Sequence, residues 1–141
     1  MKKIYFAVEA VDIDHALFFL IDSRGSIIAK QRAQFRPRNM KLLGRIVEFF
    51  KKHQLELSDI AGIISVTGPG SFTSIRSTLS IVNTWAGIAS VPIVGISRNN
   101  FSTPGDFIKK GLNLVQKTKK PKIITPFYGA LPRITAPRKR G

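Results

Sequence analysis

The chain has 141 residues, 43% of them hydrophobic, so it is long enough to form one domain with a sizeable core. It has no cysteine, which excludes disulfides, thiolate catalysis and the usual zinc sites, and no run of 18 apolar residues predicts a membrane span. Its 23 basic and 8 acidic residues give a formal net charge of +15, which favours a polyanionic partner, RNA or DNA.

The first 35 residues predict three strands. They are expected over residues 4–10, 15–21 and 26–35. Gly25 can supply positive φ in a hairpin-type turn before the third strand, whose loose alternation suits an outer strand with one wet face. Glu9, Asp12 and Asp14 interrupt the first apolar run too early for a signal peptide, so we expect a cytoplasmic protein.

A first helix is predicted from Pro37, a residue that suits the first turn of a helix. Two apolar stripes run along it at helical spacing. The stripe expected to face the core is Met40, Leu43, Val47 and Phe50. The second stripe is Leu42, Ile46 and Phe49. The two together are wider than one core contact needs, so we expect the second stripe to face a partner.

A fourth strand is predicted over residues 60–67, and a second helix over about residues 72–89. Its expected core stripe is Phe72, Ile75, Leu79, Val82, Ala86 and Ala89. No charged residue lies between Ser77 and Ser97, whereas a surface helix normally carries a charged outer face. The other side of this helix offers Ser77, Ile81, Thr84, Trp85 and Ile88 instead.

These two helices are therefore expected to form a partner surface. The residues predicted to bind the partner are Leu42, Ile46, Phe49, Ser74, Ser77, Thr78, Ile81 and Trp85. The alternative is that the chain's own C-terminal segment covers the second helix.

The remaining chain predicts a short fifth strand over residues 91–96, a loop over 99–105 and a helix over 106–116 that Gly111 weakens. Residues 117–141 hold four prolines and many cations, which predicts an irregular tail, with a short strand at 122–125. The tail is expected to contact RNA through Lys117, Lys119, Lys120, Lys122, Arg138, Lys139 and Arg140. A solubilising tail is the alternative.

The order of these elements predicts an α/β fold with a mixed five-stranded sheet. The first three strands suit an antiparallel meander, and the later two are joined through helices and so should be parallel. We expect three parts: a lobe over residues 1–98, a residual helix over 99–116 and a basic, proline-rich tail over 117–141.

A glycine-rich turn, Gly68–Arg76 (GPGSFTSIR), joins the fourth strand to the second helix. Such a turn can present backbone N–H groups to an anion, but it lacks the Walker lysine and fits neither the phosphate-loop nor the dinucleotide pattern. Ser71 is better explained as a helix N-cap, worth about 1 kcal/mol. Arg76 is expected to pair with a carboxylate, in the core or on a partner.

The element order and this turn together resemble the TsaB family, the non-catalytic subunit of the bacterial machinery that makes threonylcarbamoyladenosine in tRNA. The resemblance covers about residues 4–98 and includes Leu57–Ile63 and Pro92–Ser97; Pro126–Arg138 also resembles the end of TsaB chains. It implies one lobe of the actin-like ATPase fold, which is ribonuclease H-like. It also implies no catalytic residue, cofactor or metal in this chain, with ATP and metal on a TsaD-like partner.

The sequence departs from the family in three places. Only 44 residues follow Ser97, where family members carry a second lobe, so we expect a minimal form without the nucleotide cleft that lies between two lobes. Ser74 and Thr78 stand where the family has glycines. The first strand ends in Glu9–Val11 (EAV), without the hydroxyl residues of the family's turn.

Histidines offer no catalytic or metal site in this sequence. His15 falls in a predicted strand and His53 at a helix end, so they form no ligand pair at a usable spacing. Chains of this family often carry a peptidase label, but no Cys nucleophile, metal pair or Ser-His-Asp set can be placed here.

Two main functions remain open, besides a degenerate remnant that keeps the partner surface and has lost its role in the pathway. In the first, the chain is a non-catalytic scaffold that binds a TsaD-like subunit through its two helices, and the partner transfers threonylcarbamoyl to adenosine in tRNA. Without that partner, the same faces should form a homodimer. In the second, the chain is a stand-alone basic nucleic-acid-binding module, although it shows no RRM-type strand pair and no recognition helix.

Overall fold

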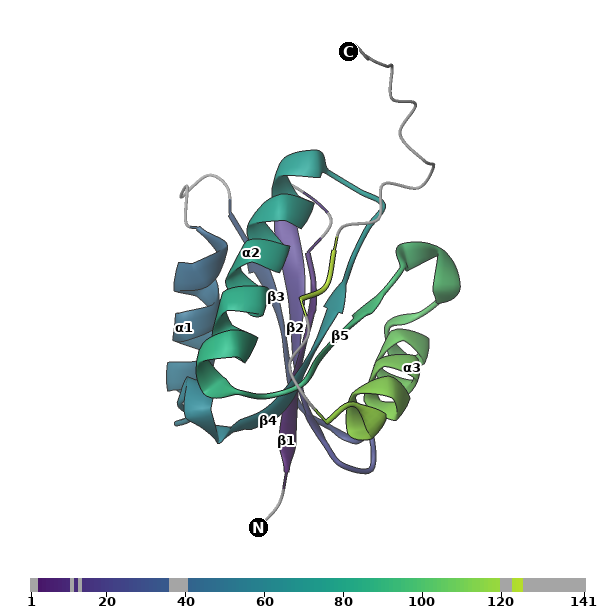
Figure 1. Cartoon of the computed structure of the whole chain (residues 1–141). Coiled ribbons are helices and arrows are strands. Elements are labelled where there is room, and N and C mark those ends of the chain that lie inside the picture. The colour runs from purple at the N-terminus through teal and green to yellow at the C-terminus, as the bar shows by residue number, and fades with distance from the viewer. Residues whose placement is uncertain (1–2, 11, 13, 36–40, 120–122, 126–141) are drawn as a thin grey trace.

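The structure, a computed structural model, describes residues 3–10, 12, 14–35, 41–119 and 123–125 (Figure 1). Five strands form one mixed sheet in the order β3-β2-β1-β4-β5. The strands are β1 (Ile4–Glu9), β2 (His15–Asp22), β3 (Ile27–Gln34), β4 (Ile60–Val66) and β5 (Ile93–Ile96). β1 to β3 are antiparallel, and β4 pairs in parallel with β1 and β5, which confirms the predicted topology.

Three helices cover the sheet. They are α1 (Leu42–Lys52), α2 (Phe72–Ala89) and α3 (Pro104–Lys117), with 3₁₀ turns at Leu57–Asp59 and Arg98–Asn100. α1 and α2 pack on one face of the sheet and α3 on the other (Figure 1). No helix in the described part of the chain is long and apolar enough to cross a membrane.

Two helix starts differ from the predictions. α1 begins at Leu42, and residues 36–40, which include the predicted start at Pro37, lie outside the described residues. α3 begins at Pro104, two residues earlier than predicted. The Thr103 hydroxyl accepts the N–H of Asp106 at 3.1 Å, and Pro104 suits the first helical position because its missing N–H needs no partner there.

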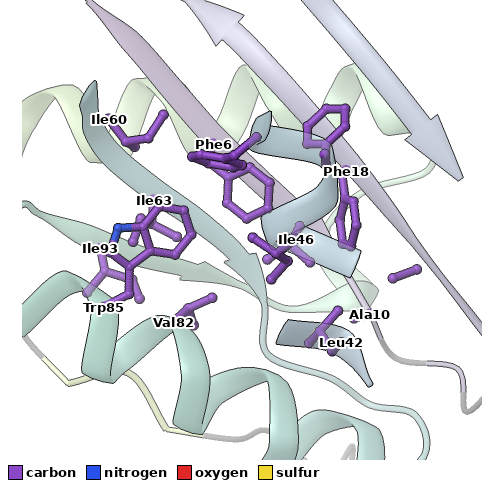
Figure 2. Close-up of a cluster of buried hydrophobic side chains, with 14 of the residues drawn as sticks. Phe6, Ala10, Phe18, Leu42, Ile46, Ile60, Ile63, Val82, Trp85 and Ile93 are labelled. Carbon is purple, nitrogen blue, oxygen red and sulfur yellow. The ribbon is translucent and has the colours of Figure 1, made fainter. Parts of the chain in front are cut away.

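A cluster of aromatic rings joins the sheet to α1 and α2 (Figure 2). Phe6 of β1 lies at its centre and is fully buried, with ring centroids 5.8 Å from Phe18, 5.2 Å from Phe50 and 5.2 Å from Trp85. Phe49 adds a further ring, 5.6 Å from Phe18. Tilted and edge-on rings at this spacing attract one another by about 0.5–1.5 kcal/mol beyond their buried area.

The prediction for the core stripe of α1 was wrong for Leu43 and Val47 and right for Phe50, and Met40 lies outside the described residues. The buried residues are Leu42, Ile46, Phe49 and Phe50. Leu43 is 50% exposed and Val47 is 40% exposed. This rotation of the helix buries both adjacent phenylalanines, whereas the predicted one buries only Phe50. Burial of one more phenylalanine stabilises the fold by about 1.5–3 kcal/mol. This difference favours the observed rotation of the helix, because the two apolar stripes have the same periodicity.

The prediction for two aromatic residues of α2 was also wrong. Trp85, expected on the outer face, is only 6% exposed, and its indole N–H donates to the carbonyl of Leu57 at 3.3 Å. Burial of the ring is therefore not opposed by an unsatisfied donor. Phe72, expected in the core, is 55% exposed.

A second apolar core lies between the sheet and α3, where the buried residues of α3 include Phe107, Leu112 and Val115. Gly111 lies at the closest approach. A Cβ atom added there would come within 2.3 Å of Cγ2 of Ile64 on β4. Gly111, which the sequence suggests only as a weak point of the helix, thus lets α3 approach the sheet, as does Gly62 of β4, where an added Cβ would lie 2.8 Å from Cγ2 of Val115.

The turn between β2 and β3 is held by Asp22, whose carboxylate accepts the backbone N–H groups of Arg24 and Ser26, both at 2.9 Å. The hydrogen bond from Ser26 is the main cause that lowers the pKa of Asp22, so this carboxylate stays charged. Gly25 has φ +93°, which confirms its predicted role in the turn.

The position of Trp85 gives a direct test of the α2 orientation. We expect Trp85→Ala to lower the free energy of unfolding by about 3–5 kcal/mol, because it removes a buried ring from the aromatic cluster. Ile88→Ala, on the same helix at 82% exposure, should change it by less than about 0.5 kcal/mol. Urea titrations followed by circular dichroism measure both. Similar small losses in the two variants would place Trp85 outside the core.

Candidate functional site

The glycine-rich turn forms a fixed link between β4, α2 and the segment after β5. Gly68 has φ +114°, which favours glycine, and its carbonyl accepts the N–H of Arg98 at 2.7 Å. The Ser71 hydroxyl accepts the N–H of Ser74 at 3.3 Å, which confirms Ser71 as the N-cap of α2. The contacts of this turn are those of a structural element.

Arg76, expected to pair with a carboxylate, has a different neighbour among the described residues. Its guanidinium lies over the ring of Phe72, 5.1 Å from the centroid, and both residues are exposed. This cation–π contact adds about 0.5–1 kcal/mol at an exposed site.

Two hydroxyl residues of α2, Ser74 and Thr78, connect this helix to the loop after β1. The hydroxyl of Ser74 donates to the carbonyl of Asp12 at 2.9 Å. The hydroxyl of Thr78 donates to the carbonyl of Ser74 at 2.7 Å and lies 3.4 Å from that of Ala10. Thr78 is 1% exposed. These side chains therefore fix α2 against the sheet and do not form an outer surface.

The set predicted to bind a partner is divided by the structure. Five members are buried in the chain's own core, namely Leu42, Ile46, Phe49, Thr78 and Trp85. Ser74 and Ile81 are half-buried, and Ser77 is exposed. The five buried residues pack inside this chain and so do not present a surface to a partner, whereas partner binding by Ser74, Ser77 and Ile81 stays a prediction.

A different set of residues forms the outer surface of the same two helices, here called the outer helix face. It consists of Leu43 and Val47 of α1 and Ser77, Ser80, Thr84 and Ile88 of α2, all exposed. From Ser77 to its end α2 has no charged residue. The exposed charges of α1 are Glu48, Lys51 and Lys52, toward the end of that helix. The uncharged stretch of α2 that the sequence shows therefore includes residues that are exposed on the surface of the molecule.

The C-terminal segment contacts α2 at one described point. The side-chain amide of Asn83 donates to the carbonyl of Ile124 at 2.9 Å and accepts the N–H of Ile124 at 2.9 Å. The Ile124 side chain lies over Gly95 of β5, where an added Cβ would come within 3.5 Å of it. Residues 123–125 form no strand, contrary to the prediction for 122–125 as far as these are described. At Asn83, therefore, the C-terminal segment does cover α2, as the alternative prediction had it.

A hollow of about 680 Å³ opens at the end of the sheet where β1 and β5 finish. Its lining includes Glu9, Asp12, His15, Ser71, Arg98 and Thr103. Glu9 and Arg98 form an ion pair across it, with the Glu9 side chain only 11% exposed. The charges of this hollow are therefore partly neutralised within the chain.

The two histidines have different neighbours. His15 Nδ1 is 3.5 Å from a carboxylate oxygen of Asp12, and the ring of His53 packs edge-on against Phe49 at 5.0 Å. In the ranges that the structure describes, no three His, Cys, Asp or Glu side chains are grouped so that they could hold a metal ion.

The residues predicted to contact RNA are only partly described. Lys117 ends α3 and Lys119 follows it, and both are exposed. Lys120, Lys122, Arg138, Lys139 and Arg140 lie outside the described residues, so their predicted contact with RNA stays a prediction.

Comparisons with known proteins agree on the kind of fold. A family model of TsaD, tRNA N6-adenosine threonylcarbamoyltransferase, matches residues 36–104. No curated protein matches the chain significantly. YeaZ from Pseudomonas aeruginosa is similar with a TM-score of 0.57 and 20% identity, over 67% of this chain and 44% of that chain. A crystal structure titled as an uncharacterized protein with similarity to peptidase YEAZ, from Pseudomonas aeruginosa, has the same TM-score and identity, over 67% and 43%.

The likeness confirms the predicted fold class, one lobe of the actin-like fold with a mixed five-stranded sheet. The family-model match covers less than half of this chain, and the solved structures share the fold at 20% identity. The chain spans less than half of the length of the solved structures that it matches, 44% and 43%.

The contact between Asn83 and Ile124 can be tested directly. We expect Asn83→Ala to speed hydrogen exchange of the Ile124 amide by at least about fivefold, because the bond that this amide donates, worth about 1 kcal/mol, is lost together with the bond to the Ile124 carbonyl. Thr84→Ala, at the next and exposed position of α2, is the matched control and should leave that rate unchanged. Exchange followed by NMR measures both. Equal rates in the two variants would mean that Asn83 does not hold the segment.

Proposed function

We propose that the chain is a non-catalytic scaffold subunit that binds a TsaD-like catalytic subunit for threonylcarbamoyl transfer to adenosine in tRNA. The partner carries the metal, the ATP site and the transfer chemistry, and this chain stabilises its active arrangement. The family-model match and the likeness to YeaZ support this assignment.

The observation that carries the proposal is the outer helix face. Residues 36–104, which match the TsaD family model, contain both α1 and α2. Ile88 is 82% exposed and Leu43 50% exposed, and no charge interrupts α2 after Arg76. Exposed apolar residues on a neutral surface favour association with another protein.

The arrangement of α1 and α2 also supports a particular mode of docking for the partner. Two neighbouring helices that lie on one sheet face can pack against two helices of a partner to form a bundle of four. In the absence of that partner, two copies of this chain would cover the same faces by isologous pairing. Because Ser77, Ser80 and Thr84 are exposed and have small side chains, close approach of a facing helix is sterically possible.

The proposal is tested by co-purification of the chain with the TsaD-like protein of the same genome, by size exclusion with light scattering. We expect a one-to-one complex with the unmodified chain. Val47→Glu combined with Ile88→Glu should weaken it at least about tenfold, because two charges would be buried unpaired at the interface.

The matched control combines Ile28→Glu on β3 with Leu114→Glu on α3. These residues are 54% and 47% exposed, so the same charge is added at similar exposure away from the outer helix face. The control should keep the complex. If the control loses the complex as well, or both variants keep it, α1 and α2 do not form the partner surface.

The second candidate function is a stand-alone nucleic-acid-binding module, and the observation that favours it is the net charge of +15. The two candidates predict different results in the same experiment. A chain that ignores the TsaD-like protein but shifts labelled tRNA in a gel would support the module and contradict the scaffold.

A further inference from the structure

Exposed cations gather on the side of the sheet that α3 covers, opposite the outer helix face. They are Lys30 and Arg32 of β3, Lys109 and Lys117 of α3, and Arg24 of the β2–β3 turn. None of the described ion pairs involves any of the five, so their charge is largely available to a partner.

The pairing of β3 with β2 fixes the direction of Lys30 and Arg32. Lys30 lies opposite Phe19 and Arg32 opposite Leu17, and both of these partners belong to the core beneath α3. Directly opposed residues of an antiparallel pair share one face of the sheet. Lys30 and Arg32 therefore point to the α3 side, about 6.6 Å apart along the strand.

A hollow of about 430 Å³ lies between α3 and the β2–β3 turn (Figure 1 shows the turn beside the end of α3). Arg24 and Lys109 line it from the two sides, and Asn113, Gln116 and Ile27 line it as well. Gln116 also donates to the carbonyl of Ser23 at 2.8 Å, which ties α3 to the turn. The hollow thus offers cations, amides and one exposed apolar side chain on a fixed frame.

The acidic residues on this side do not cancel the charge. The carboxylate of Asp22 is occupied by the backbone N–H groups of its own turn, and Arg24 lies near enough to interact with it. Asp106 pairs with Lys110 at 3.4 Å. This leaves Lys30, Arg32, Lys109 and Lys117 without a described carboxylate partner, and Lys119 follows directly after α3.

We propose that the surface formed by β3, the β2–β3 turn and α3 binds the phosphate backbone of RNA. Cations on two elements with a hollow between them can follow a backbone of phosphates, which is how proteins hold RNA without reading its sequence. The inference rests on the proposed function only in naming tRNA as that RNA. It places RNA on the opposite side of the sheet from the partner, so both can bind together.

The test compares two triple variants of the full chain with equal charge change. Lys30→Gln with Arg32→Gln and Lys109→Gln removes three of the five cations of the proposed surface. Lys41→Gln with Lys51→Gln and Lys52→Gln removes three exposed cations from the α1 side. Binding of a fluorescent, unmodified tRNA transcript is measured by anisotropy between 50 and 200 mM salt, a range over which about 10³–10⁵ in affinity is lost by proteins with many phosphate contacts.

We expect the first triple variant to bind tRNA at least about tenfold more weakly. Its slope of log affinity against log salt should also fall by about 2–3, one for each phosphate contact removed. The second should bind nearly as well as the unmodified chain. Urea unfolding of each variant checks the fold; should the first variant be destabilised, Lys109→Gln alone should still lower the slope by about 1.

Three results would overturn the proposal. Equal losses in both triple variants would show that net charge alone holds RNA. Unchanged binding in the first variant would place RNA elsewhere in the chain, such as its basic tail. Binding to vesicles that contain phosphatidylserine, with no binding to tRNA, would make the surface a membrane contact. Because the chain is tested without a TsaD-like protein, none of these results depends on the scaffold function.

Discussion

Packing around Phe6 is the interaction on which the rest of the structure depends. This ring on β1 is fully buried and contacts Phe18 of the sheet, Phe50 of α1 and Trp85 of α2. Each helix must therefore present its largest aromatic residue to the sheet, which fixes the rotation of both helices about their axes. This rotation determines which residues of α1 and α2 are exposed to solvent.

The fixed rotation explains why the two sides of the sheet differ. On the α1–α2 side, the exposed residues of α2 from Ser77 onward carry no charge, since Trp85 faces inward, and the exposed charges of α1 lie toward the end of that helix. On the other side, a single helix covers mainly β4 and β5, and the outer strand β3 presents Lys30 and Arg32 to solvent. A neutral face suits a protein partner, and a cationic face suits a polyanion. The proposed scaffold and RNA-binding roles thus use opposite sides of one sheet.

The sequence predicted the sheet, its strand directions and the N-cap Ser71 because these follow from local patterns. It could not decide the rotation of α1, since its two apolar stripes have the same periodicity and only the tertiary contact of Phe49 and Phe50 separates them. Trp85 was misplaced because its acceptor, the carbonyl of Leu57, is 28 residues away. The hydrogen bond between Asn83 and Ile124 could not be predicted either, because the two residues are 41 positions apart in the sequence.

The proposed scaffold role requires that α1 and α2 together form the partner surface. Hydrogen exchange of the chain, with and without the TsaD-like protein of the same genome, reports each helix separately. The partner should slow exchange in α1 and α2 and leave α3 and β3 unchanged. Slower exchange in α3 with none in α1 and α2 would contradict it.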